Sequence, residues 1–147
     1  MKYKLIALLL SLSLSAMAQD KLFESFAEKD NVTSVVISKK MFQMMPALGD
    51  IGLNIVNMAG KVESLNILTT EDAAQAQAMK KAFAGLTNDK HEELMRVKEK
   101  DTNATFYILQ QGERISELIM LAQTESEFTV IRLKGDFTLR DIQEIME

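Results

Sequence analysis

The chain has 147 residues, of which 47% are hydrophobic and 26% charged, and it contains 6 glycines and 1 proline. This length is typical of one domain, and the composition excludes disordered and collagen-like chains. The formal net charge of -4 at pH 7 argues against nucleic acid as a partner, because a basic surface is what holds a phosphate backbone. The absence of cysteine excludes disulfides, thiolate metal sites and a cysteine nucleophile.

Residues 1–18 have the pattern of a secretory signal peptide. Two lysines precede an uncharged stretch, Leu5–Leu14, and an A-x-A motif that ends at Ala18 follows it. The uncharged stretch is about half as long as the roughly twenty residues that a membrane span needs. We therefore expect cleavage after Ala18, no membrane span in the mature chain, and a single α+β domain over residues 19–147. This domain is expected to be exported to the periplasm or the medium.

The first half of the mature chain alternates helical and extended patterns. Apolar residues at helical spacing indicate the helices, and β-branched residues between turn signals indicate the strands. In chain order, the predicted elements are a helix around Leu22–Ala27, a strand over Val32–Ser38, a helix over Lys39–Met45 that Pro46 interrupts, a helix from Asp50 to Gly60, a strand over Val62–Leu68 and a helix that opens at Thr69–Asp72. Two consecutive strand-helix-strand units predict a parallel, right-handed arrangement if sequential strands pair.

The alanine-rich helix after Thr69–Asp72 has the clearest signals of the chain. A threonine hydroxyl is expected to cap its first turn, and acidic residues favour the positive end of the helix dipole. Its buried stripe is predicted to consist of Ala76, Met79, Phe83 and Leu86.

The second half is predicted to be an antiparallel meander followed by one helix. Short polar connections with turn residues separate four extended segments, and Thr138 can cap the last helix. The predicted strands are Glu93–Lys98, Ala104–Gln110, Ile115–Gln123 and Phe128–Lys134, and the inward side chains of the last helix are Leu139, Ile142, Ile145 and Met146. The fold class is therefore α+β, a mixed, largely antiparallel sheet with flanking helices.

The alternation within the meander predicts where its strands lie. Its two middle strands are apolar on both faces, which is typical of a central position. The final strand alternates Arg132 and Lys134 with Ile131 and Leu133, as expected of an outer strand with one wet face.

The same pattern indicates a partner site if all the helices cover one face of the sheet. An apolar patch would then stay exposed on the other face, holding either Tyr107 and Leu109 or Phe106 and Ile108. Contiguous exposed apolar patches usually mark interaction surfaces.

No motif in the chain indicates a catalytic residue, a cofactor or a metal site. His91 is the only histidine, and it is expected to be an exposed residue at a helix end or a strand start. Neither a G-x-S-x-G elbow nor a glycine-rich nucleotide-binding loop is present. One acid-base alternative pairs Glu117 with Asp136 and requires the two carboxylates to converge in a pocket. A solvated surface is the simpler interpretation of such acidic residues.

Three methionines, Met41, Met44 and Met45, lie close together in the sequence. Thioethers are soft ligands for copper(I), so a copper(I) site is one interpretation. With Phe42, the same residues also fit the buried face of a helix, in which methionine fills irregular gaps without any metal.

Two segments of the chain carry a resemblance to a known family. Asn31–Pro46, NVTSVVISKKMFQMMP, and Ile115–Ile142, with ISELIML, EFTVIRLKGDFTL and a closing Asp-Ile pair, resemble the domain of unknown function 4252 family of small exported bacterial proteins. The resemblance covers nearly the whole mature chain and implies no enzyme. The matching positions have no assigned role: Ser38, Met41, Phe42, Met45, Pro46, Glu117, Leu118, Gly135 and Asp136.

Together these patterns predict a non-enzymatic protein-interaction module of the bacterial cell envelope. The expected partner is an envelope protein or a small ligand, with a homo-oligomer as a further option. The expected contact surfaces are the Met41, Met44 and Met45 helix surface and the sheet face of Tyr107 and Leu109. An accessory role in envelope stress or sigma-factor-linked signalling is the alternative, by analogy of context alone.

Overall fold

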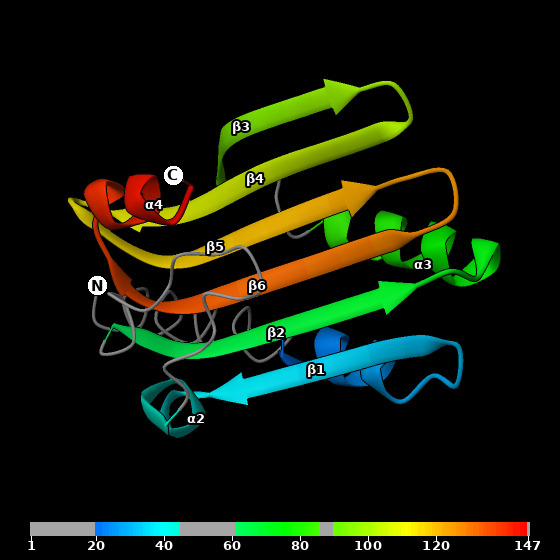
Figure 1. The fold of residues 1–147 in the computed structure, drawn as a ribbon, viewed down its shortest axis with the longest axis horizontal. Coiled ribbons are helices and arrows are strands. Elements are labelled where there is room, and N and C mark those ends of the chain that lie inside the picture. Colours follow the sequence, from blue (N-terminus) through cyan, green and yellow to red (C-terminus); the bar gives the residue numbers. More distant parts are fainter. Residues whose placement is uncertain (1–19, 45–60, 86–89, 147) are drawn as a thin grey trace, which may run out of the picture.

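The computed structural model describes residues 20–44, 61–85 and 90–146, which form one six-stranded sheet with helices on both sides (Figure 1). The elements in chain order are a helix over residues 20–27, β1 Val32–Ser38, α2 Lys39–Met44, β2 Val62–Thr70, α3 Ala73–Ala84, β3 Glu92–Glu99, β4 Thr102–Gln111, β5 Arg114–Gln123, β6 Phe128–Phe137 and α4 Leu139–Met146. The predicted α+β class is confirmed, and β1 has the bounds that its β-branched run predicts.

All pairings in the sheet are antiparallel, in the order β1-β2-β6-β5-β4-β3. The predicted parallel first half, and with it the mixed sheet, is therefore wrong. Ser38 at the end of β1 pairs with Ser64 near the start of β2, so the connection between the two strands begins and ends at the same end of the sheet. A parallel neighbour would need a crossover from one end of the sheet to the other.

The last strand, β6, lies inside the sheet between β2 and β5, and not at an edge as its charged residues predict. Its pairing with β2 joins segments that are distant in the sequence, from Thr70 opposite Phe128 to Val62 opposite Gly135. The two middle strands of the meander, β4 and β5, are interior strands as predicted. The edges are β1 and β3.

Each face of the sheet contributes to its own hydrophobic core. On one face, the helix over residues 20–27 and α3 cover the strands, and Figure 1 shows α3 behind them. The buried residues of this core are Phe23, Phe26, Val32, Leu68, Met79, Phe83, Ile119, Phe128 and Val130. On the other face, Ile142 of α4 packs at one end of the sheet against Val62, Leu65, Ile108, Ile115, Leu133 and Phe137.

The start of α3 combines two capping groups. Asp72 is the N-cap residue, and its carboxylate accepts a hydrogen bond from the Gln75 backbone N–H at 3.0 Å. The predicted threonine cap is therefore corrected to Asp72. The Thr70 hydroxyl acts one step earlier, since it donates to the Asn31 carbonyl and accepts from the Asp72 backbone N–H. Of the predicted stripe, Met79 and Phe83 are buried as expected.

The last helix, α4, begins with the predicted threonine cap. The Thr138 hydroxyl accepts from the Asp141 backbone N–H, and the Asp141 carboxylate accepts in return from the Thr138 backbone N–H. This reciprocal pair satisfies two amides that the helix itself leaves unbonded. Ile142 is buried as predicted, but Leu139 is 50% exposed, so its inward position was wrong.

Some predicted features lie outside the described residues. These are the signal peptide over residues 1–18, Met45 and Pro46, the helix from Asp50 to Gly60, and Leu86.

Candidate functional site

The face of the sheet that carries α4 has a continuous apolar row away from that helix. Through direct strand pairing, one residue of each strand lies beside the next across all six strands: Val35, Ile67, Ile131, Met120, Phe106 and Met95. At the two edges, Val35 is 41% exposed and Met95 is 38% exposed, while the four inner residues are half-buried.

A second row runs beside the first on the same face and contains only small uncharged residues. Its members, in the same strand order, are Thr33, Thr69, Thr129, Ala122, Ala104 and Val97. The Thr69 and Thr129 hydroxyls bond to each other at 3.2 Å, and Val97 is 39% exposed. We call the two rows the open face. Neither row contains a charged residue, whereas the solvated face of an antiparallel sheet is normally polar.

The structure decides which of the two predicted patches is open. Tyr107 and Leu109 lie on the face covered by the helix over residues 20–27 and α3, where Tyr107 packs against that core. Phe106 lies on the open face, while Ile108 is buried against the core below α4. The expectation required all the helices on one face, and the structure has helices on both faces; a partly exposed apolar row is nevertheless present away from α4, and Tyr107 and Leu109 do not belong to it.

The methionine helix also differs from the buried-face interpretation. On α2, Met41 is 45% exposed and Met44 is 71% exposed, so neither fills a gap in a core. Met45 lies outside the described residues. The copper(I) alternative stays a prediction.

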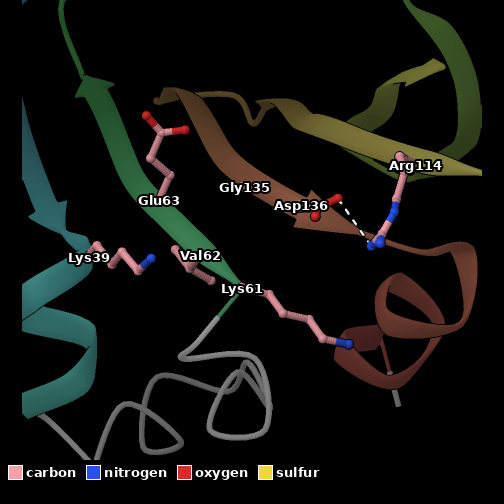
Figure 2. A pocket seen from close by; sticks show the side chains of 7 residues that line it. All are labelled: Lys39, Lys61, Val62, Glu63, Arg114, Gly135 and Asp136. Carbon is pink, nitrogen blue, oxygen red and sulfur yellow. Dashed lines mark ion pairs between the residues drawn. The ribbon is translucent and has the colours of Figure 1, made fainter.

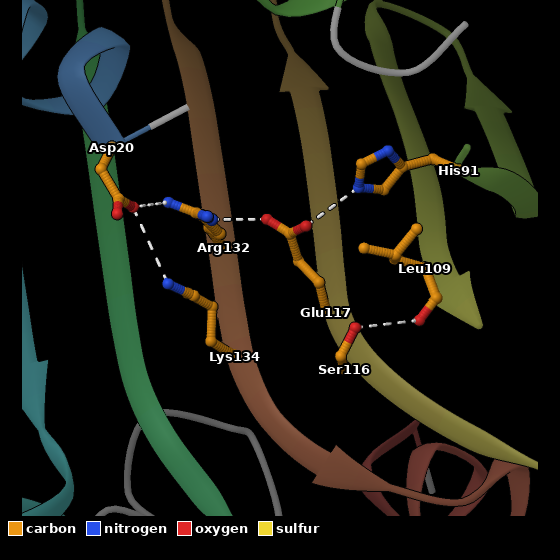
Figure 3. A network of polar contacts seen from close by, with 7 residues as sticks. All are labelled: Asp20, His91, Leu109, Ser116, Glu117, Arg132 and Lys134. Carbon is orange, nitrogen blue, oxygen red and sulfur yellow. Dashed lines mark hydrogen bonds and ion pairs between the residues drawn. The ribbon is translucent and has the colours of Figure 1, made fainter. Parts of the chain in front are cut away.

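On the covered face, four charged side chains and His91 form an ion network whose centre, Arg132, Glu117 and His91, is buried, while Asp20 is exposed (Figure 3). The Glu117 carboxylate accepts hydrogen bonds from Arg132 Nε and, at 3.0 Å, from His91 Nε2. Arg132 also donates to Asp20 at 2.8 Å, and Lys134 lies 3.7 Å from the same carboxylate. The network links the helix over residues 20–27, β6, β5 and the residue just before β3.

The Glu117 pKa reflects these partners. Burial alone would raise it, but the hydrogen bond from His91 and the charge and hydrogen bond of Arg132 bring it below the ordinary value. Arg132 also stacks over the Phe23 ring, with its guanidinium carbon 5.2 Å from the ring centroid. Arg132 and Glu117 thus form a buried charge pair in which Arg132 stabilises the charged form of Glu117.

His91 is buried, with 2% of its side chain exposed, so its predicted surface position was wrong. Its Nδ1 is also buried and finds no hydrogen-bond partner in the described part of the chain. The histidine approaches Glu117 through Nε2 alone, and neither group lines one of the two clefts described below. This geometry supports a role in holding β3 to the sheet.

A cleft of about 540 Å³ lies at the end of the sheet near α4 (Figure 2). Three basic residues line it, Lys39, Lys61 and Arg114, together with Val62, Glu63, Gly135 and Asp136. Two of the bases are paired with acids: Arg114 contacts Asp136 at 3.3 Å, and Lys61 contacts Asp141 at 2.7 Å. The charged side chains of this cleft are exposed, and Lys61 and Arg114 are each paired with an acid.

The acid-base alternative placed Glu117 and Asp136 in one pocket. Asp136 lines the cleft near α4 and its side chain is 66% exposed, but Glu117 is buried beside Arg132 and does not line that cleft. The two carboxylates therefore do not converge as the alternative requires.

A second cleft, of about 250 Å³, lies between the helix over residues 20–27 and the β1-β2 edge. Phe23, Val36 and Leu68 give it an apolar wall, and Asn66 lies in the same lining. Among the residues that the structure describes, no group of three or more histidine, aspartate or glutamate side chains is arranged to hold a metal ion. Within the same residues, no helix is long and apolar enough to cross a membrane.

The fold and the open face define this molecule as an α+β protein built on one antiparallel sheet, with two neighbouring rows of uncharged residues that cross all six strands on one face. A family model described as a domain of unknown function, DUF4252, matches residues 23–145, and the chain belongs to this family. The predicted resemblance is thereby confirmed. Comparison with curated proteins gives no match. Comparison with solved structures gives none either.

The sequence pattern did not assign several open-face residues to an exposed patch, notably Ile67, Ile131, Met95 and Val97. The signal that could have found them is the parity of each strand, since alternate residues share one face. Parity alone does not align one strand with the next, so the row of six appears only once the register is known.

Proposed function

We propose that the protein is a non-enzymatic interaction module of the bacterial cell envelope and that the open face is its partner-binding surface. The observation that carries this proposal is the uncharged character of both rows from β1 to β3. Water on an antiparallel sheet face selects alternating polar residues, whereas a protein partner selects apolar ones. Contiguous apolar surface on a soluble protein typically marks such a site.

The dimensions of the open face suit a protein partner. Six strands spaced about 4.8 Å apart make a surface about 24 Å wide between the outer strands, and two rows of side chains extend about 14 Å along them. Within this span one row is apolar in all six strands and the other adds Ala122, Ala104 and Val97, and contiguous apolar surface of this kind is often functional. Three charged residues of the central strands, Glu117, Arg132 and Lys134, are on the covered face, whereas Glu99 at the end of β3 lies beside Val97 on the side of the open face.

The proposal is tested by photo-crosslinking in intact cells that produce the full chain. A photoreactive residue at Met95 places the probe on the open face, and one at Leu139 places it on α4, where exposure is greater. We expect a discrete crosslinked product from position 95, identified by mass spectrometry, and none of the same mass from position 139. Adding V97K to the position 95 probe should abolish the product, because a lysine would lie on the contact surface.

Two results would contradict the proposal. One is the same set of products from positions 95 and 139, which would indicate random collision. The other is a position 95 product that V97K leaves unchanged. A crosslinked product from position 95 that contains two copies of this chain and no other protein would show that the open face is a contact between copies of the protein.

Export is part of the proposed function and rests on the signal-peptide pattern. The intact mass of the protein recovered from the periplasm or medium should correspond to a chain that begins at Gln19. A protein that stays in the cell and keeps Met1–Ala18 would exclude the envelope location.

A further inference from the structure

The edge strand β1 lacks the features that normally keep sheet edges apart. Its seven residues, VTSVVIS, include no charge, no proline and no glycine, and most are exposed. Val36 is 70% exposed. Edge strands present unpaired backbone N–H and C=O groups, and proteins usually protect them with charges, proline or bulges.

The other edge strand, β3, provides an internal comparison. Five of its eight residues are charged, in the sequence EELMRVKE, and Arg96 pairs with Glu93 at 2.6 Å. A register shift between Glu93 and Met95 further disturbs this edge. The molecule thus protects one edge of its sheet with charge and a bulge and leaves the other suited to strand pairing.

We propose that β1 pairs with β1 of a second copy of this chain, antiparallel and around a two-fold axis, so that the sheet runs continuously through both copies. This inference goes beyond the proposed function and rests on the edge strand, not on the open face. A two-fold axis requires a strand that is complementary to itself. A strand without charges meets this condition, because no like charges face each other.

One register pairs every residue of the strand. It places Val35 opposite Val35 of the second copy, with Ser34 opposite Val36, Thr33 opposite Ile37, and Val32 opposite Ser38. Residues directly opposite in an antiparallel pair lie on the same face, so β-branched side chains meet on the open face at three neighbouring positions. In β1, alternate residues bond to β2 and the others point their backbone N–H and C=O groups outward. This register pairs odd-numbered residues with odd and even with even, so outward-pointing residues always lie opposite each other.

The surroundings of β1 fit the same register. Val35 is the last member of the apolar row, so pairing Val35 with its counterpart joins the rows of the two copies into one. The exposed Lys39 and Lys40 follow one strand, and the exposed Asp30 lies before the start of the other. The two-fold axis brings these ends together, so Lys39 and Lys40 of one copy lie near Asp30, and near its neighbour Lys29, of the other.

The test uses the purified full chain and a charge swap at Val35. We expect the unaltered protein to show the mass of a dimer by light scattering. V35K and V35E each place two like charges opposite each other across the axis, so each alone should raise the dimer dissociation constant at least about tenfold. An equimolar mixture of V35K and V35E should recover dimers that contain one copy of each.

V97K is the matched control, because Val97 is 39% exposed, close to the 41% of Val35, but lies on the far edge strand. It should leave the dimer unchanged. Thermal unfolding checks that each variant is folded. Amide hydrogen exchange of the unaltered protein gives a measurement without any substitution: β1 amides should become more protected as concentration rises.

A protein that stays monomeric up to about 100 μM overturns the inference, because a dimer that forms only above this concentration would be too weak to matter. So does a dimer that V35K and V35E both leave intact, or one that V97K dissociates. The last result would place the contact on the open face. Because these measurements need only the purified chain, they fail or succeed independently of the crosslinking at Met95.

Discussion

Arg132 and Glu117 show how a charged pair is kept in the interior of a sheet. Their side chains are 3% and 4% exposed, and Asp20 and His91 supply further hydrogen bonds on either side. Burying ions is costly unless each charge is paired and its remaining hydrogen-bonding groups are satisfied. Removing one member therefore leaves the other in a place where water cannot replace it.

We expect E117Q to lower the free energy of unfolding by about 3 kcal/mol, because Arg132 loses the carboxylate that compensates its buried charge. The matched control is E93Q, which removes the carboxylate of the exposed Arg96-Glu93 pair and should cost less than about 1 kcal/mol. Urea unfolding of the two variants measures the difference. Equal effects would show that the buried pair adds nothing beyond a surface contact.

The lowered pKa of Glu117 predicts a pH dependence of stability. In the unfolded chain this carboxyl group has its ordinary value of 4.5, and in the folded protein the pKa is lower. The unfolded state therefore binds more protons in the acid range, so this stabilisation is fully present above pH 4.5 and is lost as the pH falls toward the folded-state pKa.

Urea unfolding at several pH values between about 6 and about 3 should show this loss. The pH dependence should be shallower in E117Q, since its amide does not titrate. Some dependence should persist in that variant because the pKa values of Asp20, Asp72 and Asp141 are also lowered. An unchanged slope in E117Q would exclude Glu117 as a source of acid sensitivity.

Among the elements, β6 depends on a close approach at its end. At Gly135 an added Cβ would overlap the Lys61 carbonyl oxygen and the Phe137 ring, and the next residue, Asp136, donates its backbone N–H to that same carbonyl at 3.0 Å. Only glycine lets the start of β2 lie this close to β6. The site couples two strands that are far apart in the sequence.

We expect G135A to destabilise the protein by about 2 kcal/mol, because either the Lys61 backbone or the Phe137 ring must move. Gly85 provides the control: it has φ -67° and an added Cβ meets nothing within 4 Å. G85A should therefore be neutral or stabilising by up to about 1 kcal/mol. Thermal unfolding compares the two variants, and a G135A protein as stable as G85A would show that the overlap is relieved at no cost.

At the scale of the whole molecule, the two faces of one sheet differ in how fully they are covered. Neighbouring residues of β5 show this directly: Ile119 is 1% exposed below the helices, while Met120 is half-buried on the open face. The free energy gained by burying an apolar side chain scales with the area removed from water. The open face accordingly contributes less to the stability of the isolated chain.

We expect I119A to lower the free energy of unfolding by about 3 kcal/mol and M120A by about 1 kcal/mol, although both remove a large side chain. Urea unfolding at low protein concentration checks this without self-association. Equal losses would mean that Met120 is as well packed as Ile119 and that this part of the open face is not available to a partner.

The sequence by itself determined the elements and the family. The β-branched run of β1, the four meander strands and the Thr138 cap depend on residues close together in the chain, and local patterns report such features well. An uncovered apolar patch was expected only if all the helices covered one face of the sheet, whereas the structure has helices on both faces.

Only the tertiary structure decided the strand order, and with it the sites. The pairing of β2 with β6 joins residues that are far apart in the sequence, from Thr70 with Phe128 to Val62 with Gly135, and no local pattern encodes that choice. Arg132 was therefore interpreted as a surface residue of an outer strand, because the carboxylates of Glu117 and Asp20 that compensate it come from other elements. The same holds for the open face, since each strand contributes one member of the row and the register between distant segments aligns them.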